Sequence, residues 1–417
     1  MSTMTAKPQF RALDGRSGGY YGLLGILVVV IGLGLLAAVL KSAHGHYITG
    51  MDNQIVWGLP HVFAIFLIVA ASGALNVASI ASVFGRTIYK PLAPLSGLLA
   101  VALLVGGLAI LVLDLGRPDR LVVAMTHYNF KSIFAWNIFL YTGFIAIVLV
   151  YLWFLMERRM NRYAPTTGML AFVWRLILTT GTGAIFGFLV AREAYDAAIL
   201  APLFIAMSFA FGLAVFLLVT LAAYQWSERP LGDLILRRLK NLLGVFVAVV
   251  LYFVAVYHLT NLYATRLHGV ETFLLLEGGI YPALFWVGQI LLGSLLPLAL
   301  LFHPVWSRAR KVIATASALV ILGGLAQLYV IIIGGQAYPL DMFPGFEVSS
   351  SFYDGVVVPY TPTLVEFLLG LGGVGLALFL VVVAIKFLHF LPVSLADHKV
   401  DPHHASRTDT VTASAET

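Results

Sequence analysis

The chain has 417 residues, of which 60% are hydrophobic and only 11% are charged, and its mean hydropathy is +0.96. A soluble protein is closer to half apolar and one quarter charged, so this composition excludes a soluble globular protein and indicates an integral membrane protein. With no cysteine, the protein itself cannot hold a thiolate-bound iron–sulfur cluster, a disulfide or a redox thiol. The net charge of +6 does not indicate nucleic-acid binding, because basic residues in a membrane protein first report its orientation.

Ten apolar runs are long enough to cross a bilayer, for which a helix needs about 20 residues. They cover residues 20–41, 57–84, 93–114, 131–155, 168–190, 201–225, 239–260, 280–302, 311–333 and 364–390. These runs are continuous, whereas the strands of a membrane barrel alternate apolar and polar residues. The sequence therefore predicts an all-α, polytopic bundle of about ten transmembrane helices.

The runs divide the chain into a membrane domain and two tails. We expect an N-terminal tail over residues 1–19, a membrane domain over 20–390 and a disordered C-terminal tail over 391–417. Within the membrane domain, the last helix should cover 364–390, after a long connection over 334–363.

The distribution of Lys and Arg predicts the orientation. If the runs alternate in direction, 17 basic residues lie on the side of the two tails and six, including Lys41, lie on the other. The positive-inside rule then places both termini in the cytoplasm of a multi-pass protein of the cell inner membrane. Arg175 and Lys386 lie inside runs, and we expect their long side chains to extend to the basic side.

The connection over residues 334–363 has a composition unlike that of the other connections. It contains no Lys or Arg and is rich in aromatic residues, among them Phe343, Phe346, Phe352 and Tyr353. Loops of this length are usually functional or disordered, and disordered segments are poor in aromatic residues. We expect an ordered loop on the outer face that docks a partner.

Polar groups that could carry chemistry gather at the outer ends of three runs: His61, Asp114 with Arg117, and Arg192 with Tyr195. Charged groups at membrane depth are costly, so they are candidates for function by default. Structural explanations stay open. His61 could bond a backbone carbonyl, Asp114 and Arg117 could neutralise each other at a spacing of three, and Arg192 could lie at a solvated boundary.

Bound haem is not expected, because a haem in a helical bundle usually needs facing histidines. His61 and His258 are the histidines that fall inside runs, and they form at most one isolated pair. A metal site is not expected either, because no His and carboxylate set has ligand spacing that suits a helix. The polar side chains at the membrane centre are mainly Asn76, Gln289 and Gln327. A pump usually places carboxylates or histidines across the membrane, so the sequence gives less support to an ion transporter.

Two stretches carry a resemblance to a known family. The segment from Asp114 to Pro118, with sequence Asp-Leu-Gly-Arg-Pro, closes a run and resembles the membrane subunits of polysulfide-reductase type, the NrfD family. The stretch that begins Gly-Gly-Gln-Ala-Tyr-Pro at Gly334 and continues to Pro362 is similar to the ten-span branch of that family. Within this branch it looks most like the DsrP subunit of the sulfite-reduction-associated Dsr complex.

The resemblance implies a subunit with no redox centre of its own, which binds a quinone (menaquinone or ubiquinone) near the outer face. It also implies two four-helix bundles, here over 57–200 with the quinone site and over 201–333. A ferredoxin-like iron–sulfur subunit would dock on the outer face, beside other subunits of a membrane redox complex and membrane lipid. Transferred to this sequence, the family's site residues are His61, Asp114, Arg117, Arg192 and Tyr195.

Together these features predict a membrane subunit that exchanges electrons between the quinone pool and an iron–sulfur partner, in sulfur metabolism. Oxidation of a quinol releases two protons, for which a histidine and a carboxylate are suitable acceptors. We expect His61 and Tyr195 to bond the quinone ring, Asp114 to take or relay a proton, and Arg117 and Arg192 to hold the carboxylate. The alternatives are an ion- or proton-translocating subunit without a quinone site and a passive membrane anchor.

Overall fold

The computed structural model describes residues 9–340 and 355–400. Ten of its helices are long and apolar enough to cross a membrane, and its described residues form no β-strand beyond two isolated bridges. The prediction of an all-α polytopic protein is therefore confirmed. The ten spans are Gly18–His44, Leu59–Ser82, Thr87–Asp114, Ile133–Met156, Asn161–Gly187, Leu200–Trp226, Asp233–Tyr263, Ile280–Phe302, Arg310–Ala337 and Leu364–Phe387.

Several spans consist of more than one helical segment. The first half of the sequence forms α1 (Gly18–His44), α2 (Leu59–Ala74), α3 (Asn76–Ser82), α4 (Ala93–Asp114), the short α5 (Leu121–Thr126), α6 (Ile133–Met156) and α7 (Ala164–Gly187). The second half forms α8 (Leu200–Trp226), α9 (Asp233–Tyr263), α10 (His268–Thr272), α11 (Ile280–Ala283), α12 (Leu296–Phe302), α13 (Arg310–Tyr329), α14 (Gly335–Ala337), α15 (Leu364–Phe387) and α16 (Asp397–Val400). The second half also contains three π-helical segments: η6 (Phe273–Glu277), η7 (Leu284–Leu295) and η9 (Val330–Gly334).

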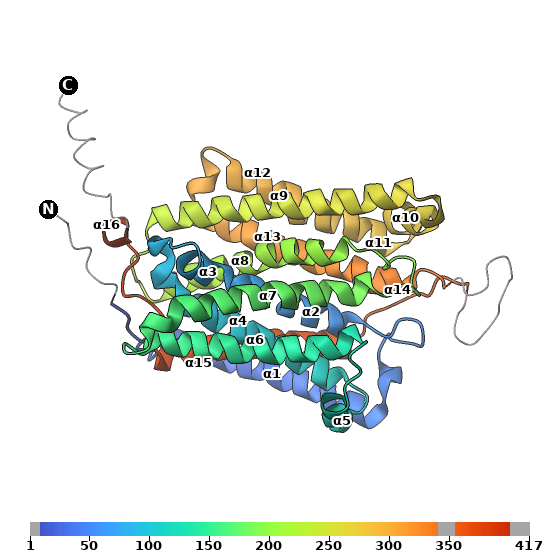
Figure 1. The fold of residues 1–417 in the computed structure, drawn as a ribbon, viewed down its shortest axis with the longest axis horizontal. Coiled ribbons are helices and arrows are strands. Elements are labelled where there is room, and N and C mark those ends of the chain that lie inside the picture. Colours follow the sequence, from blue (N-terminus) through green and yellow to red (C-terminus); the bar gives the residue numbers. More distant parts are fainter. Residues whose placement is uncertain (1–8, 341–354, 401–417) are drawn as a thin grey trace.

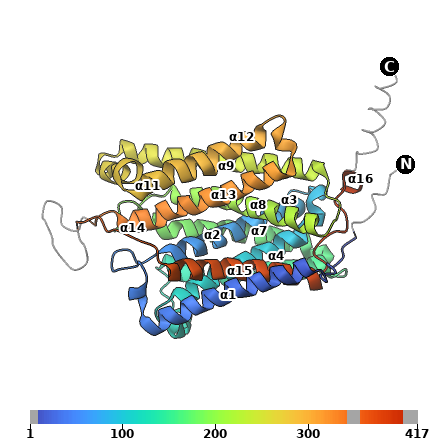
Figure 2. The ribbon, with the colours of Figure 1, turned by 180° about the vertical axis from the view of Figure 1, so that it is seen from behind.

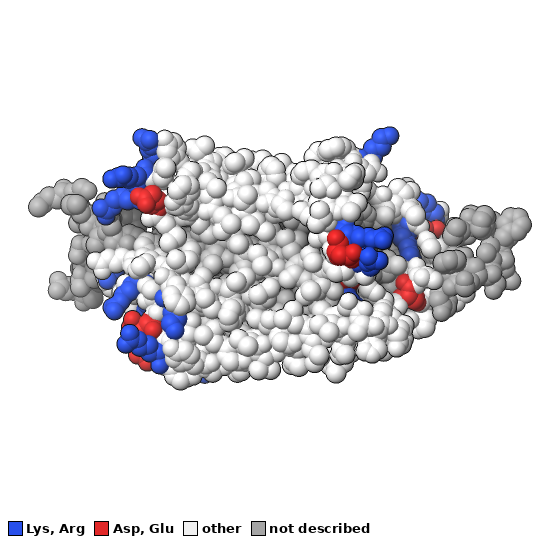
Figure 3. Space-filling view, turned by 90° about the horizontal axis from the view of Figure 1, so that it is seen from below, with Lys and Arg blue, Asp and Glu red and all other residues white. Residues whose placement is uncertain are grey.

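The long helices lie side by side, and the two termini lie at the same end of the bundle (Figures 1 and 2). We call this the termini end, and the opposite end, which carries α5, α10 and α14, the distal end. Charged side chains gather toward the two ends, and the middle of the face in Figure 3 carries none. An uncharged middle between two charged ends is what a protein in a bilayer needs.

Helix α2 lies at the centre of the bundle, where it packs against α4, α7, α8 and α15. Its crossing with α8 is made by two glycines: a Cβ atom on Gly73 would lie 1.5 Å from the Ser208 carbonyl oxygen, and one on Gly212 would lie 2.2 Å from the Ala74 nitrogen. Helices in a membrane associate by close packing, and glycines let the two backbones approach.

Arg175 does not extend to the basic side of the membrane as predicted. It is only 1% exposed, and its guanidinium lies between the rings of Phe172 and Phe209, 4.9 and 5.0 Å from their centroids. The prediction was wrong because α7 turns this residue toward α2 and α8, where two aromatic faces and the Ser72 carbonyl contact the cation.

The predicted disordered tail is wrong for residues 391–400. Leu391 and Leu395 are buried, and Arg229 donates hydrogen bonds to the backbone of this segment at Leu391 and Pro392. The last helix also ends earlier than predicted, because α15 stops at Phe387. Residues 1–8 and 401–417 of the predicted tails lie outside the described residues.

We predict that Gly212→Leu prevents the α2–α8 crossing, because the added side chain would meet backbone atoms that cannot rotate away. The loss of stability should exceed the roughly 1–3 kcal/mol of an ordinary overfilled core. Thermal unfolding in detergent measures it. Gly25→Leu is the matched control, since a Cβ there would meet nothing within 4 Å. Equal unfolding temperatures for the two variants would contradict this account of the crossing.

Candidate functional site

Asp114 is the last residue of α4, and its side chain is only 2% exposed. The carboxyl end of a helix carries partial negative charge, which is unfavourable for a carboxylate. No basic residue lies in the last turn of α4 to compensate. A buried carboxylate in this place therefore needs cations from other helices.

Lys41, near the end of α1, provides the first cation. Its ammonium group donates a hydrogen bond to Asp114 Oδ1, and its side chain is 3% exposed. Sequence analysis missed this residue, because a basic residue at the end of an apolar run was counted as a loop charge. The signal that could have found it is depth, since Lys41 lies in the last turn of the first span and Asp114 ends the third, both at the distal end.

His61, in the first turns of α2, provides the second group. Its Nδ1 lies 3.1 Å from Asp114 Oδ2, but the two atoms are not aligned for a hydrogen bond. Within the described part of the chain, both buried atoms therefore lack a hydrogen-bond partner. The His61 side chain is 21% exposed. The imidazole thus lies between the buried carboxylate and the protein surface.

An aromatic cluster centred on Trp57 lies beside His61 and includes rings from α6 and α7. Trp57 precedes α2, and its ring centroid lies 6.3 Å from His61, 6.0 Å from Phe134, 5.7 Å from Phe186 and 6.5 Å from Tyr195. Phe134 is 45% exposed. Together these rings form a wall of apolar surface beside the imidazole.

Gln336 and Arg192 hold the segment that leads into α2. The Gln336 side-chain oxygen accepts hydrogen bonds from the backbone NH groups of Val56 and Trp57, each at 3.0 Å. Arg192 donates to the carbonyl oxygens of Gln336 at 2.9 Å and Gln54 at 2.7 Å. Burial lowers the pKa of Arg192, and these carbonyls take the place of the lost water. Arg192 thus positions backbone rather than the carboxylate of Asp114.

Tyr195 packs behind Trp57 and is 1% exposed. Its hydroxyl donates a hydrogen bond to the Ile332 carbonyl oxygen at 2.6 Å, and burial raises the pKa of that hydroxyl, so the proton stays on it. A Cβ atom on Gly335 would lie 2.4 Å from the Tyr195 ring, so the glycine is required for this contact. Because the Tyr195 hydroxyl already donates its proton to the Ile332 carbonyl, Tyr195 contributes its ring to the aromatic wall beside the imidazole.

Glu366 and Tyr360 hold the same segment from the side of α15. The Tyr360 hydroxyl accepts a hydrogen bond from the Leu59 NH and donates one to Glu366 Oε1, both at 2.7 Å. Glu366 Oε2 accepts from the Gly50 NH at 3.0 Å. Burial, followed by the charge of Glu366, raises the pKa of Tyr360. The start of α2, and with it His61, is therefore fixed from two sides.

The structure brings together some of the predicted residues and separates others. His61 and Asp114 are in contact. Tyr195 packs against Trp57, and Trp57 in turn lies beside His61. Arg117 is 64% exposed and pairs with Asp119 at 2.9 Å, so the predicted Asp114–Arg117 pair and its role in holding the carboxylate are wrong. The backbone turns outward at Leu115, beyond the end of α4, so the spacing of three does not continue on one helical face.

The predicted docking residues Phe343, Phe346, Phe352 and Tyr353 lie outside the described residues. The predicted connection begins later than expected, because helix continues through η9 and α14 to Ala337. Gln336 therefore belongs to the end of the ninth span, and Tyr360 to the described end of the connection, and both hold the segment that leads into α2.

Residues 47–339 match the protein family described as "Polysulphide reductase, NrfD", and the chain belongs to this family. It is 28% identical over 94% of its length to the "Hdr-like menaquinol oxidoreductase integral membrane subunit" of Archaeoglobus fulgidus, of which 99% is covered. It is 23% identical over 93% to the C subunit of the selenate reductase of Mesobacillus selenatarsenatis, of which 97% is covered. It is also 26% identical over 69% to the C chain of the polysulfide reductase of Wolinella succinogenes, of which 96% is covered. The predicted family is confirmed.

We predict that Lys41→Met destabilises the protein by about 3–5 kcal/mol, because it leaves the buried Asp114 carboxylate without its ammonium partner. The double variant Lys41→Met/Asp114→Asn should recover a large part of this loss, since it removes both charges. A double-variant cycle of thermal unfolding in detergent measures the coupling. Additive effects of the two single substitutions would show that the pair contributes nothing to stability.

Proposed function

We propose that this protein is the quinone-reactive membrane subunit of a respiratory electron-transfer complex. The observation that carries the proposal is the partly exposed His61, backed by a buried Asp114 that Lys41 compensates. The relatives support it, since one is named for menaquinol oxidation and others are named as components of reductases. The first of these names favours menaquinone over ubiquinone.

The residues around His61 fit a quinone head group. Pockets for such ligands are mostly apolar, with few convergent polar groups. Trp57 and the exposed face of Phe134 offer ring surface beside the imidazole. The imidazole of His61, whose side chain is 21% exposed, is the polar group in the site that a ligand can reach. A bound quinol supplies two electrons and two protons.

His61 is the proton acceptor in this proposal. Its Nδ1 faces Asp114, which leaves Nε2 for the ligand. When Nε2 takes a proton, the imidazole becomes a cation, and Asp114 stabilises it at 3.1 Å. Lys41 keeps Asp114 ionised and in place. Asp114 is thus the positioning and stabilising group, and Arg192, Gln336 and Tyr195 hold the wall.

The electrons released by the quinol pass to a partner subunit. The protein has no cysteine to hold a cluster, so we propose a ferredoxin-like iron–sulfur subunit bound at the distal end, close to His61. The relatives carry the names of subunits of reductases or oxidoreductases, which supports a multi-subunit complex. The name of the polysulfide reductase relative supports a role in sulfur metabolism.

We predict that His61→Gln lowers quinol oxidation by about 10²-fold or more, the usual contribution of a general base. Glutamine keeps a hydrogen-bonding group of similar reach and removes the base. The rate at which quinol reduces the assembled complex, measured by stopped flow, tests this prediction. Arg117→Gln is the matched control and should keep the wild-type rate, because the Arg117 side chain is exposed and, among the described residues, pairs with Asp119 at the surface. A wild-type rate in assembled His61→Gln would favour a passive anchor instead.

We propose that the protein lies in the cell inner membrane with both termini in the cytoplasm and the His61 site on the outer side. Asp14 precedes α1 at the termini end, Asn129 lies between α5 and α6 at the distal end, and the wild-type protein has no cysteine, so Asp14→Cys and Asn129→Cys report on opposite ends. A membrane-impermeant thiol reagent added to intact cells should label only Asn129→Cys. Labelling of Asp14→Cys alone would reverse the orientation and the side of the site.

A further inference from the structure

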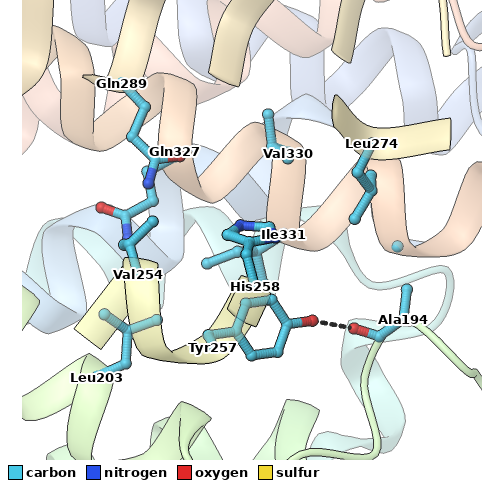
Figure 4. Close-up of a pocket in the computed structure, with 11 residues that line it drawn as sticks. Ala194, Leu203, Val254, Tyr257, His258, Leu274, Gln289, Gln327, Val330 and Ile331 are labelled. Atoms are coloured by element: carbon cyan, nitrogen blue, oxygen red, sulfur yellow. Dashed lines mark hydrogen bonds between the residues drawn. The ribbon is translucent and has the colours of Figure 1, made fainter. Parts of the chain in front are cut away.

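All three π-helical segments in the described part of the chain border one cavity between α8, α9 and α13. Leu274 of η6, Gln289 of η7 and Val330 of η9 line it. His258 and Tyr257 of α9 complete the wall (Figure 4). π-Helical turns are rare and occur frequently at functional sites, so their convergence here indicates a site.

The cavity suits water rather than a larger ligand. The space open to the centre of a water molecule is about 20 Å³, and about 10–15 Å³ is enough for one water. The side-chain nitrogen of Gln327, a residue 2% exposed, lines this cavity and has no hydrogen-bond partner among the described residues. A buried donor without a partner is costly, and a water in the cavity would satisfy it. A quinone ring would not fit, so the cavity is distinct from the His61 site.

A titratable pair stands at the distal side of this cavity. His258 Nδ1 lies 2.7 Å from Glu271 Oε2, and Asn261 donates to Glu271 Oε1 at 2.8 Å. The Glu271 side chain is 0% exposed and that of His258 is 13% exposed. With Nδ1 bonded to Glu271, Nε2 of His258 is left for a water in the cavity.

The surroundings supply no fixed charge to the pair. On α9, Tyr257 uses its hydroxyl to donate to the Ala194 carbonyl at 2.8 Å, and η7 presents the Phe285 ring at 4.7 Å from His258. Among the described residues, His258 is the only basic group within 4 Å of Glu271. The elements around the pair also carry His268 at the start of α10, whose Nε2 bonds the Leu262 carbonyl at 2.8 Å, Glu277 at the end of η6, and the surface pair of Arg266 and Asp196 at 3.4 Å. The buried Glu271 carboxyl group is therefore held by the His258 imidazole and the uncharged Asn261 amide.

Polar groups continue from the cavity toward the middle of the bundle. Gln289 and Gln327 line it and also line a second small cavity, which Ser294 borders farther along η7. Because η7 begins near the distal end, Ser294 lies closer to the termini end than Gln289. The sequence of groups is therefore the His258–Glu271 pair, the first cavity, the two amides and the second cavity.

We propose that this region is a proton-binding site, in which His258 and Glu271 share one proton and exchange it with water in the amide-lined cavity. A proton passes from hydronium to His258 Nε2 and leaves a water, while the Nδ1 proton passes to Glu271 Oε2. The ring is then neutral again, and the carboxyl carries the proton. The site gives protons access from the distal end to the middle of the second half of the chain, and it does not depend on the His61 site.

Infrared titration of the purified full-length protein in lipid nanodiscs tests this site. The carboxyl signal of the pair should be present in the wild-type protein and absent in Glu271→Gln. It should persist in Glu366→Gln, the matched control, whose buried carboxyl bonds Tyr360 and Gly50 elsewhere. A signal unchanged by Glu271→Gln would overturn the proposal.

Exchange of that proton in D₂O tests the water in the cavity. Gln327→Leu removes the unpartnered amide and fills the space with an apolar side chain, so exchange should slow on the order of tenfold, as for one lost hydrogen bond. Unchanged exchange would reduce the pair to a structural one and overturn the proposal. Glu271→Gln should keep the wild-type rate of quinol oxidation. A negative result for the His258–Glu271 site is therefore distinguishable from a negative result for the His61 site.

Discussion

The distal half of the protein is organised by a single constraint, a carboxylate buried at the carboxyl end of a helix. Asp114 meets the negative end of the α4 dipole, in a place that water does not reach. It is stable there because Lys41 approaches from α1 and His61 from α2. Three helices are thereby tied at one point. The same constraint places the one partly exposed member of the group, His61, beside a carboxylate that can stabilise its charged form.

The position of His61 depends on parts of the sequence that follow it by hundreds of residues. Gln336 and Arg192 bind the backbone before α2 on one side, and Glu366 with Tyr360 binds it on the other. These contacts are made largely to backbone groups, so they fix where the segment runs. The end of the ninth span, the connection that follows it and the last span are therefore part of the site.

The protein handles buried polar groups in two ways. Buried charges are compensated directly, Asp114 by Lys41, Glu271 by His258, and Arg175 by two aromatic faces. The amides Gln289 and Gln327 of the second half instead lie beside helices that depart from α-helical geometry. A π-turn shifts the residues beyond it on the helix surface, which opens space beside Gln289 and Gln327 without a charge.

The sequence by itself determined the ten spans, because each membrane helix must satisfy its own backbone with about 20 apolar residues. It also placed His61 and Asp114 at one depth. The partner of Asp114 was decided only by tertiary structure: Arg117 is three residues away but lies beyond the helix end, whereas Lys41 is remote in sequence and adjacent in space. The burial of Arg175 was hidden for the same reason, since which face of a span meets a neighbour depends on helix packing. Apolar length is a local property, whereas the pairing of charges across helices is set by their arrangement.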